Sequence, residues 1–211
     1  MTIESNEIPL SPVRAARLIA VEGKDELNLL SALKDQLGIG DMEIRCLGGK
    51  YSFSTKLRTL MITPGFISVV SFGVMRDANS NALATFQSVC EALRNTGLPV
   101  PTRPLTPAKA DQGKPQVVVL IVPHGASKGM LEDICLQSVG EDPAMTCVEA
   151  YFECLTRNLG KLPSNLSKAK VHAFLSSRDQ PDLRLGEAAQ AGYWPWTHQA
   201  FDQVRQFLSL L

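Results

Sequence analysis

The sequence predicts an α/β fold in which a mostly parallel central sheet is flanked by helices and followed by a C-terminal helical extension. Three observations predict this class. From residue 17 onward, short β-prone apolar runs alternate with amphipathic helical segments, as in a right-handed parallel sheet. The run over residues 66–75 is too uniformly apolar to face water, and the run over residues 116–122 gives the strongest strand signal. Beyond residue 145 the pattern becomes helical.

The first half of the chain supplies two strands and two helices. Residues 17–21 read as a buried strand, and residues 24–37 as a helix that Gly38 is placed to end. The apolar face of this helix carries leucines at helical spacing, Leu27, Leu30, Leu33 and Leu37. Residues 42–47 alternate apolar and charged side chains, which predicts a strand exposed on one side. A short helix is expected to end near Pro64.

The second half begins with a buried strand over residues 66–75 and a helix over residues 81–94. Residues 97–115 contain five prolines, which favour an extended connection or a lid over one edge of the sheet. Residues 116–122 are the strongest strand in the chain. Two apolar stripes at helical spacing follow residue 145.

These elements divide the chain into three parts. Residues 1–15 are expected to form a flexible arm, residues 16–144 an α/β core, and residues 145–211 a helical layer packed on that core. The sequence shows no internal repeat.

Composition excludes several classes of protein. Lysine and arginine (21) balance aspartate and glutamate (21), so no overall field draws the chain to nucleic acid or an anionic membrane, and any such contact must be local. The five cysteines are odd in number and lack C-x-x-C spacing, which argues against a disulfide framework or a thiolate zinc site. No signal peptide or apolar run of membrane-spanning length is present, so we expect a soluble, cytoplasmic protein.

Carboxylates follow three of the predicted strands. Glu22 follows the first strand, Asp77 the third, and Glu132 and Asp133 the fourth. The carboxyl ends of parallel strands meet at one edge of a sheet, where open α/β folds bind ligands. Like charges held together there raise one another's pKa, and Mg²⁺ or Mn²⁺ would neutralise them. Glu132 and Asp133 are equally consistent with a charged first helical turn.

The neighbouring polar residues have simpler structural interpretations. Asp25 and Glu26 are expected to be the charged start of a helix rather than part of a site. Arg76 could pair with Asp77, and Asp77 or Asn79 could cap the helix that follows.

The motifs at these strand ends resemble those of the Toprim domain, a metal-binding Rossmannoid fold shared by topoisomerases, primases and the overcoming-lysogenization-defect (OLD) nucleases. The similar segments are Val21-Glu22-Gly23-Lys24, the strand end at Asp77 and residues 129–133. From about residue 17 to the C-terminus, the chain resembles a family of small Toprim-like proteins. A glutamate loop, an Arg-Asp-Ala-Asp type strand end, a Leu-Glu-Asp segment and a Lys-Ala-Lys segment recur in that family.

The resemblance implies roles for individual residues. Glu22 takes the place of the Toprim glutamate, which acts as general acid or base or as a metal ligand. Asp77 takes the place of the first metal-binding aspartate, and Asn79 stands where the second aspartate is expected.

By analogy with OLD-type nucleases, Glu132 and Asp133 are further metal ligands. Lys168 or Lys170 is the cation that stabilises the transition state. Taken without the resemblance, both lysines read as solvated helix charges.

The function that follows is Mg²⁺- or Mn²⁺-dependent phosphodiester cleavage, as in a nuclease acting on DNA or RNA. Asn79 and the zero net charge motivate an alternative, a catalytically weak Toprim module that serves an ABC-like or SMC-like ATPase as partner or effector. A nucleotide or other phosphate-ligand binder is a third hypothesis. No membrane partner is expected, and a homo-oligomer is compatible with the sequence.

Overall fold

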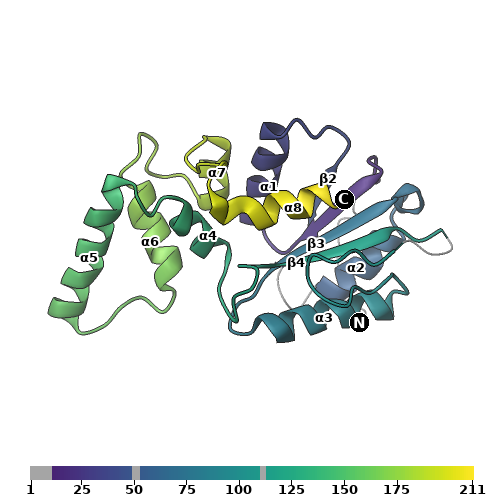
Figure 1. The fold of residues 1–211 in the computed structure, drawn as a ribbon, viewed down its shortest axis with the longest axis horizontal. Coiled ribbons are helices and arrows are strands. Elements are labelled where there is room, and N and C mark those ends of the chain that lie inside the picture. The colour runs from purple at the N-terminus through teal and green to yellow at the C-terminus, as the bar shows by residue number, and fades with distance from the viewer. Residues whose placement is uncertain (1–10, 49–52, 110–112) are drawn as a thin grey trace, which may run out of the picture.

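The computed structural model describes residues 11–48, 53–109 and 113–211. Within these residues, four strands form an all-parallel sheet in the order β2-β1-β3-β4 (Figure 1). The strands are β1 (Arg17–Val21), β2 (Glu43–Cys46), β3 (Ser71–Asp77) and β4 (Gln116–Val122). The predicted α/β class with a parallel central sheet is confirmed. None of the helices in the described ranges is long and apolar enough to span a bilayer.

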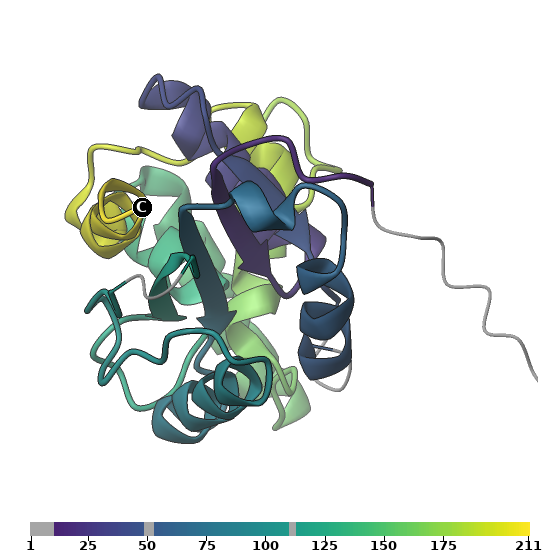
Figure 2. The same ribbon diagram turned by 90° about the vertical axis from the view of Figure 1, so that its right-hand side faces the viewer.

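Helices cover both faces of the sheet (Figures 1 and 2). One face carries α2 (Phe53–Met61) and α3 (Ala82–Asn95). The other carries α1 (Lys24–Gln36) and the helices after β4. These later helices are α4 (Leu131–Ser138), α5 (Pro143–Leu159), α6 (Leu166–Leu175), α7 (Leu185–Gln190) and α8 (Asp202–Ser209), with single 3₁₀ turns η1 (Phe66–Ser68) and η2 (Gln199–Phe201). The pair α5 and α6 extends away from the sheet in Figure 1.

The pleat of the strands assigns successive side chains to opposite faces. On β3, Val74 packs in the cluster of α2 and α3, and Met75 packs in the cluster of α1 and α4. The alternation continues to the end of the strand. Arg76 contacts Phe53 of α2, and Asp77 contacts the start of α4. Arg76 and Asp77 are adjacent in the sequence, but their side chains therefore lie on opposite faces of the sheet.

The strand predicted over residues 66–75 is partly wrong. Residues 66–68 form the 3₁₀ turn η1, and the ladder with β1 begins at Ser71. Ile67 and Val70 are exposed, so the apolar run is not buried along its length. Gly65 precedes the turn with φ 90°, close against the backbone of Val13, and this conformation breaks an extended run.

The proline-rich connection covers the outer edge of β4, as predicted. Leu105 donates its backbone N–H to the Val119 carbonyl at 2.8 Å, and Ala108 exchanges two backbone hydrogen bonds with Val117 at 2.8 and 2.9 Å. These bonds pair backbone groups of an edge strand that would otherwise stay open.

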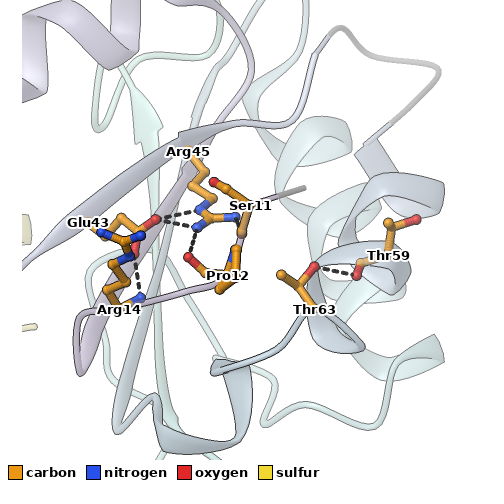
Figure 3. Close-up of polar contacts among 7 residues, drawn as sticks. All are labelled: Ser11, Pro12, Arg14, Glu43, Arg45, Thr59 and Thr63. Atoms are coloured by element: carbon orange, nitrogen blue, oxygen red, sulfur yellow. Dashed lines mark hydrogen bonds and ion pairs between the residues drawn. The ribbon is translucent and has the colours of Figure 1, made fainter. Parts of the chain in front are cut away.

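Residues 11–14, before β1, are joined by hydrogen bonds to side chains of the edge strand β2 (Figure 3). The buried guanidinium of Arg45 donates to the carbonyls of Ser11 and Pro12 and to the carboxylate of Glu43, which also accepts from the backbone N–H of Arg14. Nearby, Thr63 of the loop after α2 donates to the Thr59 carbonyl at 2.9 Å. The first ten residues of the predicted arm lie outside the described residues.

Helix α8 lies directly on the central strands. A Cβ atom added at Gly73 of β3 would lie 2.7 Å from the ring of Phe207, 2.7 Å from Leu211 and 3.2 Å from Ile19. Glycine at this position therefore lets the last helix approach the sheet closely.

Candidate functional site

Asp77 ends β3 at the carboxyl edge of the sheet and is largely buried. Its Oδ1 accepts a hydrogen bond of 2.9 Å from the backbone N–H of Leu131, at the start of α4. Burial, together with the nearby charges of Glu26 and Glu132, raises the pKa of Asp77 to about 8. The surroundings of Asp77 therefore disfavour the ionised form of its carboxyl group.

Glu26 is the second carboxylate at this edge. It lies in the first turn of α1, as expected, but it is buried (8% exposed) rather than solvated. Burial raises its pKa, with further contributions from Glu22, Asp25 and Glu132. A Cβ at Gly23 would lie 2.7 Å from the Glu26 carboxylate, so glycine there leaves room for the side chain.

Glu132 is the third carboxylate, in the first turn of α4. It is 7% exposed, and its Oε1 lies 3.5 Å from the Nζ of Lys168 on α6, a side chain that is half exposed. We refer to Glu26, Asp77 and Glu132 as the acidic cluster. They come from α1, β3 and α4. Glu132 raises the pKa of both Glu26 and Asp77, and Glu26 raises that of Asp77.

The oxygen donors of the acidic cluster are of the kind that Mg²⁺ and Mn²⁺ prefer. The raised pKa values of Glu26 and Asp77 fit a cation-binding role, because a divalent ion would offset the burial and the repulsion that raise them. In the conformation described, however, no three His, Cys, Asp or Glu side chains of the described ranges converge closely enough to ligate one ion.

Glu22 follows β1 but faces the other side of the sheet edge. Its Oε2 accepts hydrogen bonds from Nε and Nη2 of Arg76, at 2.9 and 2.6 Å. Arg76 is 3% exposed, and its guanidinium lies 5.1 Å from the centre of the Phe53 ring. Arg76 thus pairs with Glu22 and not with Asp77.

Asn79 shapes the loop after β3. It adopts φ 52°, a conformation that asparagine tolerates better than most residues, and it exchanges two backbone hydrogen bonds with Gly129 at 2.7 and 2.8 Å. Its Nδ2 donates to the Asp77 carbonyl at 3.1 Å. The expectation that Asp77 or Asn79 caps the next helix is wrong, because Asn81 accepts the capping bond from Ala84.

Asp133 and Lys170 make contacts outside the acidic cluster. Asp133 accepts a bond of 2.8 Å from the Met130 backbone N–H and a bond of 2.5 Å from the Ser167 hydroxyl, which ties α4 to α6. Lys170 pairs with Glu149 of α5 at 2.6 Å. Of the two lysines considered from the sequence, Lys168 is the one beside a cluster carboxylate.

A cavity of about 370 Å³ adjoins the acidic cluster at Glu132. Its lining is mostly charged and polar, with Asp25, Glu132, Lys168, His172 and Arg184 beside Val171 and Leu185. The cavity therefore joins one carboxylate of the cluster to basic side chains of α6 and of the residue before α7.

Sequence reasoning missed Glu26, although the sequence carries a signal for it. Glu26 continues the spacing of Leu30 and Leu33, which are both fully buried on α1. A carboxylate on the apolar stripe of a helix is a buried charge, and buried charges need partners or serve a site.

Comparisons with known proteins agree on the fold. The model of a family described as "Protein of unknown function (DUF3226)" matches residues 16–211. The structure resembles that of a hypothetical protein from Pyrococcus horikoshii OT3, with 17% identity over 92% of this chain and 94% of that one, at a TM-score of 0.57. It also resembles the C-terminal region of the Burkholderia pseudomallei OLD protein, with 13% identity over 93% and 97% and a TM-score of 0.50. Among curated proteins no match was found.

Proposed function

Because the chain belongs to the DUF3226 family, whose function is open, we propose from its own residues that it is a Toprim-type, divalent-metal-dependent phosphodiesterase acting on nucleic acid. The acidic cluster carries this proposal. Carboxylates from three segments, two of them buried and the third partly buried, lie near the ligand-binding edge of a parallel sheet, beside a lysine. The motifs shared with Toprim domains, and the fold shared with the C-terminal region of an OLD protein, support it.

We assign the metal to the acidic cluster. Asp77 and Glu132, two of the ligands expected from the sequence, would hold Mg²⁺ or Mn²⁺ together with Glu26. Side-chain rotations would bring the three carboxylates to one ion. Asn79 and Asp133 contribute by fixing the loop and the helix that carry these ligands.

The chain's own residues would then act on the phosphate. A bound divalent ion would polarise the phosphoryl group as a Lewis acid. Lys168, next to Glu132, would offset the negative charge that develops on the phosphoryl oxygens. Both hydrogen bonds from Arg76 reach Oε2 of Glu22, so we assign proton transfer to its other oxygen, Oε1.

Cleavage of plasmid DNA and of a single-stranded RNA in the presence of Mn²⁺ tests this function. Asp77→Asn is expected to abolish cleavage, because it removes the central ligand and preserves the size of the side chain. Asp35→Asn is the matched control, since Asp35 is a highly exposed residue of α1. Cleavage by Asp77→Asn at the wild-type rate would rule out the assignment.

A specific observation favours a second candidate, a module that binds a phosphate ligand or an ATPase partner without cleaving. Glu22 already has a buried counter-ion in Arg76, and an asparagine stands at position 79, so two Toprim roles are altered. Titration calorimetry separates the candidates. Mn²⁺ binding without cleavage of any nucleic acid would favour the module.

A further inference from the structure

Two of the three basic residues that line the cavity beside Glu132, His172 and Arg184, have no part in the proposed chemistry. Lys168 and His172 are four residues apart on α6, so their side chains share one face of that helix. Arg184 approaches from the residue before α7, with its backbone N–H bonded to the Glu187 carboxylate at 2.8 Å. Two separate elements thus direct hydrogen-bond donors toward one space.

The two acids that line the cavity have other partners. Oδ1 of Asp25 accepts a hydrogen bond of 3.1 Å from the backbone N–H of Gly186. Glu132 belongs to the acidic cluster and lies near Lys168. Among the described residues, no ion pair joins Arg184 to either acid, and Glu132 has its ion pair with Lys168.

We propose that this cavity binds a backbone phosphate of a nucleic-acid strand, next to the phosphodiester that is cleaved, through Arg184 and His172 with Lys168 between them and the acidic cluster. This inference rests on the proposed function and names the part of the substrate that the cavity holds. The planar guanidinium of arginine matches a phosphate with two hydrogen bonds, and an imidazole N–H donates in either protonation state. The volume of about 370 Å³ lies within the range of small ligand sites.

The charges around the cavity couple the binding of this phosphate to the binding of the metal ion. Without a cation, the charges of Lys168 and Arg184 are balanced by those of Asp25 and Glu132, so the cavity attracts an anion weakly. With a divalent ion at the acidic cluster, the charge of Glu132 would be neutralised and the cavity would be positive. Each ligand therefore raises the affinity for the other, as linkage requires.

Fluorescence anisotropy with a labelled single-stranded phosphorothioate oligonucleotide, which resists cleavage, tests the proposal in Mn²⁺ and in EDTA. Arg184→Gln is expected to weaken binding in Mn²⁺ about tenfold and to lower the salt dependence by about one phosphate contact. Arg184→Lys should retain part of the affinity. Arg157→Gln on α5 is the matched control, because Arg157 is exposed and lines no part of this cavity.

The result that overturns the proposal is an Arg184→Gln protein that binds the oligonucleotide as tightly as the wild type at every salt concentration. Wild-type binding that is equal in Mn²⁺ and in EDTA overturns the coupling. The proposed function fails by a different measurement, namely a wild-type protein that shows no Mn²⁺ binding in calorimetry. Unchanged Mn²⁺ binding by Arg184→Gln, with weakened oligonucleotide binding, supports the phosphate site.

Discussion

Glu22 at the end of β1 and Arg76 of β3 form a buried ion pair in which one carboxylate oxygen accepts two guanidinium hydrogen bonds. The pair follows from the register of the sheet. Val21, the last residue of β1, is aligned with Met75, so Glu22, which follows it, stands beside Arg76 and not beside Asp77. The next residue of β3, Asp77, belongs to the acidic cluster on the opposite face of the sheet. The candidate site therefore draws on both faces of the sheet at its edge, and the charge of Glu22 still raises the pKa of Glu26 and Asp77.

The Glu22–Arg76 pair should be energetically coupled. Arg76→Met leaves a mostly buried carboxylate without its counter-ion, and Glu22→Met leaves a buried guanidinium, so each single change should lower the free energy of unfolding by about 3 kcal/mol. The double variant removes both charges and should be more stable than the sum predicts, with a coupling of about 1–3 kcal/mol. Urea denaturation of the four proteins measures it. Additive losses would mean that the pair contributes nothing beyond its separate side chains.

Asp77 should make the metal-free protein less stable as pH rises. Its folded-state pKa, about 8, lies above the ordinary value of 3.8, so its stabilising effect is complete below about pH 4 and is lost as pH rises to about 8. Asp77→Asn removes this dependence and should be more stable than the wild type at pH 8 without metal, by an amount of the order of a few kcal/mol. Thermal unfolding at a series of pH values measures the difference, with Asp35→Asn as control. A wild-type stability that is flat between pH 5 and pH 8 would contradict the burial of this charge.

Metal binding should release protons. At neutral pH the raised pKa keeps Asp77 largely protonated, and a metal ligand must be ionised. Calorimetric Mn²⁺ titrations in buffers of different ionisation enthalpy should give heats that differ between buffers and an affinity that rises with pH. Glu132→Gln should weaken Mn²⁺ binding by about tenfold or more, since it removes a charged ligand. Glu153→Gln on the exposed side of α5 should have no effect, and an equal loss in that variant would indicate nonspecific binding.

Gly73 should not tolerate a side chain. An alanine Cβ there would lie 2.7 Å from the Phe207 ring, so α8 would have to shift, at a cost of about 1–3 kcal/mol. Gly40→Ala is the control, because a Cβ at Gly40 meets nothing within 4 Å and its backbone is not left-handed. Chemical denaturation should show a lower midpoint for Gly73→Ala only. Similar stability of the two variants would show that α8 adjusts freely.

Much of the fold could be predicted because the spacing of apolar residues indicates which face of a helix or strand is buried. The leucine stripe of α1 and the apolar run of β4 correspond to elements with nearly the expected bounds. Residues 66–70 could not be assigned in this way, because an apolar run does not reveal that Ile67 and Val70 face outward.

The site was harder to predict for a related reason. The sequence places Glu22, Asp77 and Glu132 at one edge of the sheet, but the direction of each side chain depends on strand register, which the sequence does not give. The spacing of Glu26 with Leu30 and Leu33 places it on the buried stripe of α1, but that spacing does not show that Asp77 and Glu132 are its neighbours.

The contact between Gly73 and Phe207 also has a consequence for the order in which the chain can fold. All four described strands are complete by Val122, but one face of β3 and β4 is covered by Val204, Phe207 and Leu208 of α8. During synthesis, a nascent chain that ends between these points has this face covered by α1 and α4 but lacks the apolar side chains of α8. We therefore expect the core to close only after residues 202–209 leave the ribosome, and chaperone binding or aggregation to be most frequent just before that moment.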